Sequence, residues 1–175
     1  MRKYAFIVMM PDLNPSEYRT SCSAGDNEIT FVGVDNMDQA KAVVDELMAS
    51  GYEKFDLCGS FDESMANEVV DAAKSGAGFS YVTFTGDDWS RFGVLLAADG
   101  VDRVHEMELP GEFHSSVRIV GSMDDAIKTA KSLVSEGATF IEMGSWFDDA
   151  KSSEIIKAAS SEIPMGSAGR NEKRS

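Results

Sequence analysis

The chain has 175 residues, of which 43% are hydrophobic and 26% charged, a composition typical of a globular protein with a core of its own. Its formal net charge of −14 argues against nucleic acid and anionic membrane surfaces as partners, because both are bound through clustered lysine and arginine. No apolar run approaches the roughly 20 residues that span a bilayer. Cys22 and Cys58 are too few for a disulfide framework, so a cytoplasmic location is expected.

Strand-like and helix-like segments alternate in the first half of the chain. Continuous apolar runs indicate buried strands, and apolar residues spaced three and four apart indicate helices. The first helix can be capped by Asp35 or Asn36, and the second by Ser60 or Asp62. In chain order, the sequence predicts a strand over 4–10, a hairpin over 18–23 and 28–34, a helix from 37 to 48, a strand over 52–58, a helix from about 62 to 73, and a strand over 79–85.

The second half of the chain predicts the same series again. Its expected elements are a strand over 92–97, a hairpin over 101–109 and 115–120, a helix over 123–135, a strand over 139–143, a helix over 149–160 and a short strand over 164–168. Shifting the sequence by about 86 positions superposes identical residues without a gap, among them Gly51 on Gly137 and Phe61 on Phe147. Self-similarity at a fixed offset is the signature of an internal duplication.

The duplication predicts an α/β protein made of two tandem repeats. Residues 1–85 and 92–168 are the expected repeats, with 86–91 as a linker and 169–175 as a disordered tail. Each repeat reads as strand, hairpin and βαβα-β, in which right-handed crossovers give parallel strands. We expect the repeats to pack about a pseudo-twofold axis, as one mixed sheet or with a barrel-like closure.

The first repeat resembles a family of small prokaryotic proteins known only as a domain of unknown function. The resemblance rests on Ala5-Phe6-Ile7, Asn14-Pro15 with Tyr18-Arg19, Val32-Gly33-Val34 with Ala40, and Asp56-Leu57-Cys58-Gly59-Ser60-Phe61. Where this chain has the last motif, family members read Glu-Leu-Cys-Gly-Gly-Phe, and the second repeat reads Glu142-Met143-Gly144-Ser145-Trp146-Phe147. The resemblance implies no activity. It implies that single-repeat relatives pair as homodimers and that this chain fuses such a pair, so a monomer or a homodimer is expected.

Candidate site residues follow the predicted strand over 52–58 and its counterpart in the second repeat. Ligands of α/β proteins lie beyond the carboxyl ends of parallel strands, so a ligand is expected near Gly59, Ser60, Phe61 and Trp146. Arg19 is a candidate for holding a carboxylate ligand, with an exposed salt bridge as its alternative. No phosphate-binding glycine loop, cofactor motif or dedicated metal-ligand spacing is present in the sequence.

Asp56, Cys58 and Glu142 are the candidate catalytic residues. The two acids occupy equivalent positions and could form an acid–base pair or bind a divalent cation. The alternative is that each accepts a hydrogen bond from backbone or faces solvent. Cys58 could be a nucleophile at a helix N-terminus, but Asp62 would oppose its ionisation, and a small buried cysteine is the alternative.

Three functions therefore stay open from the sequence. The first, which we favour, is binding of a small polar metabolite or divalent cation between the repeats. The second is a lyase or isomerase that uses Asp56 and Glu142 as acid and base. The third is a structural or assembly module without a ligand, and the absence of any diagnostic catalytic motif weakens only the second.

Overall fold

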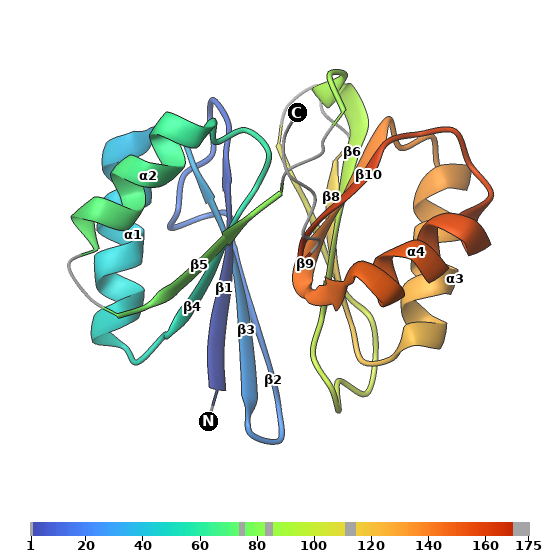
Figure 1. Cartoon of the computed structure of the whole chain (residues 1–175), viewed down its shortest axis with the longest axis horizontal. Coiled ribbons are helices and arrows are strands. Elements are labelled where there is room, and N and C mark those ends of the chain that lie inside the picture. Colours follow the sequence, from blue (N-terminus) through green and yellow to red (C-terminus); the bar gives the residue numbers. More distant parts are fainter. Residues whose placement is uncertain (1, 74–75, 83–85, 111–114, 170–175) are drawn as a thin grey trace.

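The computed structural model describes residues 2–73, 76–82, 86–110 and 115–169 (Figure 1). The first repeat consists of β1 (Arg2–Met9), β2 (Arg19–Ala24), β3 (Asn27–Val34), α1 (Met37–Ala49), β4 (Lys54–Leu57), α2 (Glu63–Ala72) and β5 (Gly78–Tyr81). The second consists of the 3-10 turn η1 (Trp89–Arg91), β6 (Phe92–Ala97), β7 (His105–Glu108), β8 (Ser116–Val120), α3 (Met123–Ser135), β9 (Phe140–Asp148), α4 (Asp149–Ala159) and β10 (Met165–Gly169). The predicted alternation of strands and helices is confirmed in both repeats.

Each repeat forms one five-stranded sheet, and the two sheets share one topology. The strand order is β2-β3-β1-β4-β5 in the first sheet and β7-β8-β6-β9-β10 in the second. The hairpin strands β2 and β7 are antiparallel to their neighbours, and the other pairings are parallel. This confirms an α/β protein of two tandem repeats. Neither of the two arrangements left open by the sequence, one mixed sheet or a barrel-like closure, is found among the described strands. The sheets stay separate because each buries one face under helices and the other against its partner sheet.

The molecule therefore has four layers, with helices outside and the two sheets face to face in the middle (Figure 1). Helices α1 and α2 cover the outer face of the first sheet, and α3 and α4 cover that of the second. Strand β1 illustrates the result, since residues 5–8 all have no exposed surface. Burial on both faces explains why this strand is a continuous apolar run without alternation. None of the described helices has the length and apolarity needed to cross a membrane.

Equivalent residues cap the equivalent helices of the two repeats. The Gln39 backbone N–H donates to the Asn36 side chain over 3.0 Å, and the Asp125 N–H donates to Ser122 Oγ over 3.1 Å. Asp62 and Asp148 accept in the same way at the starts of α2 and α4. A side-chain oxygen at this position satisfies a backbone donor that the first turn of a helix leaves unpaired.

The second repeat departs from the prediction at the end of its fourth strand. The predicted strand ended at residue 143, yet β9 continues to Asp148, whereas β4 in the first repeat ends at Leu57. The continuation is held by β10, which pairs with β9 as far as Gly169 opposite Asp148, across a bulge. Gly169 therefore belongs to a strand and not to the expected tail. Residues 170–175 and the end of the expected strand over 79–85 lie outside the described residues.

Candidate functional site

Two buried carboxylates connect the sheets. The Ser145 backbone N–H donates to Asp56 Oδ2 over 2.7 Å, and the Gly59 N–H donates to Glu142 Oε1 over 3.0 Å. Both carboxylate side chains have no exposed surface. Asp56 and Glu142 are equivalent under the repeat offset, as are Gly59 and Ser145, so each repeat gives a carboxylate and receives one. This exchange is the relation that a local twofold axis between the repeats would require.

Burial dominates the electrostatics of Asp56. Loss of hydration raises the pKa of this carboxyl to about 6, against the opposing effects of the bond from Ser145, the charge of Lys54 and the nearby Tyr4 hydroxyl. Burial, and then the charge of Asp56, hold the pKa of Tyr4 well above its usual range. The two groups lie close together without reaching hydrogen-bond geometry, so neither Tyr4 Oη nor Asp56 Oδ1 has a partner among the described residues.

The Tyr4 hydroxyl lies directly against the backbone of Gly144. A Cβ atom at position 144 would overlap Tyr4 Oη and would lie 3.0 Å from Leu96 Cδ2. The repeat offset places Ser90 opposite Tyr4 and Cys58 opposite Gly144. The contact of a tyrosine with a glycine therefore occurs at only one of the two equivalent places between the sheets. The contact between the sheets is asymmetric in this respect.

Cys58 lies in the first repeat's turn as a buried thiol. Its Sγ and Ser60 Oγ are 2.6 Å apart, and Ser60 Oγ accepts a hydrogen bond from the Met9 backbone N–H over 3.3 Å. Burial, with a contribution from the charge of Glu142, raises the pKa of Cys58 to about 12. A thiol with so high a pKa is protonated near neutral pH and is a poor nucleophile. Phe61, next in the motif, is fully buried in the core.

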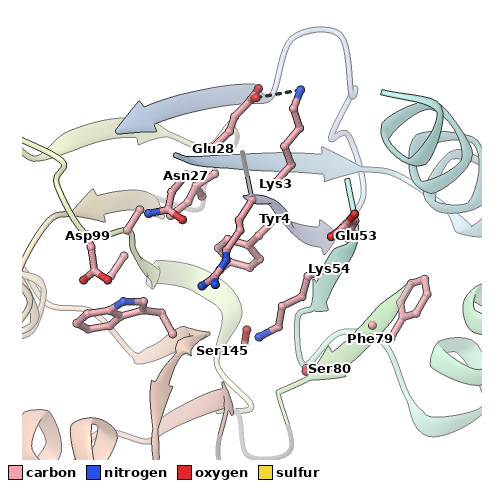
Figure 2. Close-up of a pocket in the computed structure, with 16 residues that line it drawn as sticks. Lys3, Tyr4, Asn27, Glu28, Glu53, Lys54, Phe79, Ser80, Asp99 and Ser145 are labelled. Carbon is pink, nitrogen blue, oxygen red and sulfur yellow. Dashed lines mark ion pairs between the residues drawn. The ribbon is translucent and has the colours of Figure 1, made fainter. Parts of the chain in front are cut away.

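A cavity of about 510 Å³ lies between the repeats, and we call it the inter-sheet cavity. Its wall includes Lys3, Tyr4, Lys54, Ser80, Ser145 and Trp146 (Figure 2). The first repeat contributes the starts of β1, β3, β4 and β5, while the second contributes the ends of β6 and β9. The amino-terminal edge of one sheet thus meets the carboxyl-terminal edge of the other. A cavity of this volume suits a small organic molecule.

The charges of the cavity wall differ in how they are neutralised. Lys3 Nζ forms an ion pair with Glu28 over 3.1 Å, drawn as a dashed line in Figure 2, and the Tyr52 hydroxyl also donates to Glu28 over 2.9 Å. Lys54, by contrast, forms no ion pair with a carboxylate in the part of the chain that the structure describes. Its side chain extends from β4 into the cavity toward Ser145 (Figure 2).

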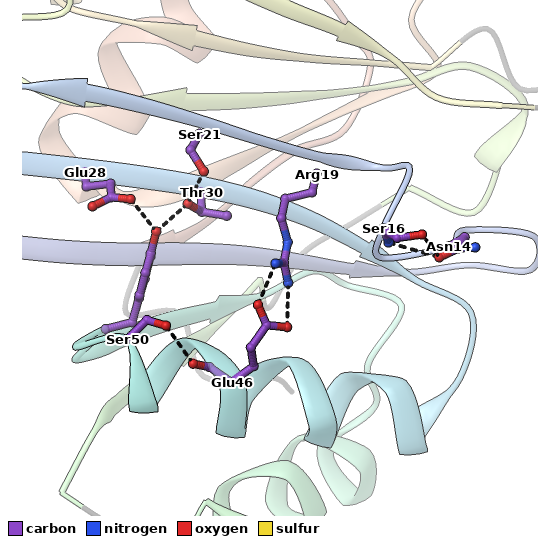
Figure 3. Close-up of polar contacts among 9 residues, drawn as sticks. Asn14, Ser16, Arg19, Ser21, Glu28, Thr30, Glu46 and Ser50 are labelled. Atoms are coloured by element: carbon purple, nitrogen blue, oxygen red, sulfur yellow. Dashed lines mark hydrogen bonds and ion pairs between the residues drawn. The ribbon is translucent and has the colours of Figure 1, made fainter.

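The candidate residues from the sequence are divided between this cavity and other places. Trp146 lines the cavity, and Asp56 lies behind its wall, bonded to the lining residue Ser145. Gly59, Ser60 and Phe61 are not part of the lining. Arg19 lies elsewhere and forms a two-pronged ion pair with Glu46 of α1, at 2.7 and 3.1 Å (Figure 3).

Sequence reasoning missed Lys54 and Tyr4 as cavity residues. Lys54 was recognisable only as sharing a strand face with Asp56, and Tyr4 as part of an apolar strand. The useful signal was the asymmetry between the repeats, since the repeat offset places Phe140 at the position of Lys54. Phe140 is fully buried and packs against Trp89, with ring centroids 4.8 Å apart. The charged wall therefore has an aromatic counterpart at the equivalent place.

No metal centre is found in the described part of the chain, where no group of three or more His, Cys, Asp or Glu side chains could hold an ion. The arrangement of Asp56 and Glu142 agrees with this, since a described backbone N–H donates to each carboxylate. What the fold and the cavity define is a two-repeat α/β protein with a cavity between its sheets.

The chain belongs to the family of unknown function DUF6506, whose model matches it twice, over residues 2–93 and 90–174. The two matches confirm the tandem duplication. No curated protein matches the sequence. Among solved structures, the chain has a distant likeness to the ABC domain in complex with L-Trp from Streptococcus pneumonia, with 8% sequence identity and a TM-score of 0.32 over 97% of this chain and 76% of that one. A likeness at this level carries no argument about function.

Proposed function

We propose that this protein binds a small polar metabolite in the inter-sheet cavity. The observation that carries the proposal is the make-up of the cavity wall, which combines the cation of Lys54 with the hydroxyl residues Ser80 and Ser145 and the indole of Trp146. Binding sites for small molecules are concave, mostly apolar and lined by a few polar groups that converge on the ligand. An apolar contact between sheets without a function would not need such a wall.

The same contacts give less support to the two alternatives. An acid–base role for Asp56 and Glu142 requires that their carboxylates reach a substrate, yet neither side chain is part of the cavity lining. Their bonds to Gly59 and Ser145 suit a positioning role, in which Asp56 holds the segment that carries Trp146. A pure assembly module would be expected to close the cavity with apolar side chains, as Phe140 and Trp89 do at the equivalent place.

Thermal-shift measurements against a panel of polar metabolites, with a variant that fills the cavity, test this proposal. Ser80→Trp places an indole in the wall, and Ser153→Trp, at an exposed position of α4, is the matched control. We expect a saturable stabilisation that follows RT ln(1 + [L]/Kd), about 2.7 kcal/mol at a hundredfold excess over Kd. It should persist in Ser153→Trp and disappear in Ser80→Trp. If no compound stabilises the parent protein, or if Ser80→Trp responds like its parent, binding in this cavity is refuted.

A further inference from the structure

The inter-sheet cavity has a chemical preference that can be read from its wall. We propose that its ligand is a small organic carboxylate whose carboxyl group pairs with Lys54 and whose apolar part lies against Trp146. This inference rests on the proposed function, because it names the class of ligand that the same cavity takes. It follows from the charges of the wall, from their distribution between the repeats and from the indole of Trp146 in the same wall.

The first step concerns which cation of the wall can pair with a ligand. Lys3 and Glu28 neutralise each other across the start of the sheet. Arg2 and Lys54 line the cavity and form no direct ion pair with a described carboxylate, and the charge of Lys54 acts on buried Asp56 only at longer range. The Lys54 side chain extends toward Ser145 in Figure 2, and we assign the pairing with the ligand to it. A carboxylate beside an ammonium group and a hydroxyl forms charge-assisted hydrogen bonds, which are stronger than neutral ones.

The second step concerns the amount of negative charge that the cavity tolerates. Asp99 and Glu53 belong to the wall together with the two unpaired cations, and both acids are exposed. The whole chain carries a net charge of −14. A phosphate group would bring close to two negative charges into this acidic setting, and the chain has no glycine-rich loop to cradle it. A carboxylate brings only one, which Lys54 can balance.

The third step concerns the body of the ligand. Trp146 is half-buried in the wall, and its position is fixed by neighbours. Lys151 Nζ lies 4.5 Å from the centroid of the indole, and Phe147 packs edge-on against it at 5.0 Å. Phe79 also belongs to the lining, but its ring stacks on Phe55 and points away from the cavity (Figure 2). The fixed indole of Trp146 favours a ligand with an apolar or aromatic body, because its burial adds to the ion pair.

The fourth step is the difference between the repeats. The repeat offset places Phe140 at the position of Lys54, and there the side chain is part of a buried cluster with Trp89 and Phe92. A lysine needed only for solubility or folding would not have to face a cavity in one repeat while a buried phenylalanine takes its place in the other. The cation at position 54 is thus tied to the inter-sheet cavity and, through it, to an anionic ligand.

The indole N–H of Trp146 is a local probe for this proposal. The chain has only two tryptophans, so two indole cross-peaks are expected in a ¹H–¹⁵N spectrum, and Trp146→Phe assigns them. The full-length protein is titrated with acetate, butyrate, succinate and benzoate, with the corresponding neutral amides, and with inorganic phosphate, all at one ionic strength. The same titrations use Lys54→Met and, as a matched loss of one charge on the surface of α3, Lys131→Met.

At least one carboxylate should shift the Trp146 cross-peak saturably. The corresponding amide should bind at least about tenfold more weakly, a factor that corresponds to about 1.4 kcal/mol. Lys54→Met should cost the carboxylate a similar factor, whereas Lys131→Met should leave its affinity unchanged. The carboxylate class is overturned if amides or phosphate bind as well as carboxylates, if Lys54→Met has no effect, or if no carboxylate shifts the cross-peak. Saturable binding of a neutral compound in these experiments would leave the proposed function standing while refuting the carboxylate.

Discussion

Replacing Gly144 with alanine should destabilise the protein strongly, because β9 passes against the Tyr4 hydroxyl at this residue. A methyl group there would overlap Tyr4 Oη, lie 3.0 Å from Leu96 Cδ2 and lie 3.3 Å from Tyr4 Cζ. Approaches below 3.0 Å force a neighbour to move. The Tyr4 oxygen has little room to do so, since it is buried beside Asp56 between the sheets. Overpacking a well-packed core costs about 1–3 kcal/mol, and we expect the upper part of this range.

The hydroxyl itself is the predicted cause, so removing it should rescue the variant. In Tyr4→Phe the Oη atom is absent, and the methyl group at position 144 then meets only contacts of 3.0 Å or longer, which small shifts relieve. Tyr4→Phe alone should cost less than about 1 kcal/mol, because Tyr4 Oη makes no full hydrogen bond among the described residues. The double variant should recover about half of the loss or more, a coupling energy of about 1–2 kcal/mol.

Urea denaturation at neutral pH, followed by circular dichroism, measures all the free energies of unfolding for this cycle. Gly76→Ala is the matched control, because a Cβ atom there would have no atom within 4 Å and should leave stability almost unchanged. The reasoning is refuted if Gly144→Ala is as stable as its parent, or if Tyr4→Phe does not reduce its cost.

Three further predictions concern single residues. Because burial raises the pKa of Asp56 to about 6 from an ordinary value near 3.9, the stability that its protonation provides below about pH 4 should be lost as the pH rises through 6. The free energy of unfolding should fall by about 3 kcal/mol over this range, and Asp56→Asn should flatten this part of the pH–stability profile. An unchanged slope in Asp56→Asn would show that other groups cause the pH dependence. Iodoacetamide at pH 8 should modify buried Cys22 and Cys58 only after unfolding, because burial raises both pKa values, and rapid labelling of the native protein would contradict this. Arg19→Met should lower stability by less than about 1 kcal/mol and leave ligand affinity unchanged, since Arg19 pairs with partly exposed Glu46 away from the cavity; a lost thermal shift would place Arg19 in the site.

Local structure was predictable wherever its cause lies within a few residues. The helix over Met123–Ser135 was predicted with the boundaries found, because apolar spacing and the preceding turn define both of its ends. Asn36 and Asp62, each one of two proposed caps, are the residues that accept from the first turns of α1 and α2. Where pairing with a distant strand decides the boundary, as in the extension of β9 by β10, the prediction was wrong.

The candidate site was predictable only in part. Equivalence of Asp56 and Glu142 follows from the repeat offset, and the alternative that such acids bind backbone was considered. That each binds the backbone of the other repeat depends on how two sheets face each other, which no local pattern encodes. The rule that ligands lie beyond the carboxyl ends of strands pointed to Trp146 in the second repeat. It could not indicate Lys54, which begins a strand of the first repeat and reaches the cavity only because the sheets oppose unlike edges.

By itself, the sequence determined the duplication, the α/β class and most of the helices and strands of each repeat, since apolar periodicity, caps and turns are local and repeat at one offset. Only the tertiary structure decided that the sheets remain separate and that the inter-sheet cavity lies between them. It also decided which residues line that cavity. The physical reason is that these features depend on the side chains that two already formed surfaces bring together, such as Tyr4 against Gly144 and Lys54 toward Ser145.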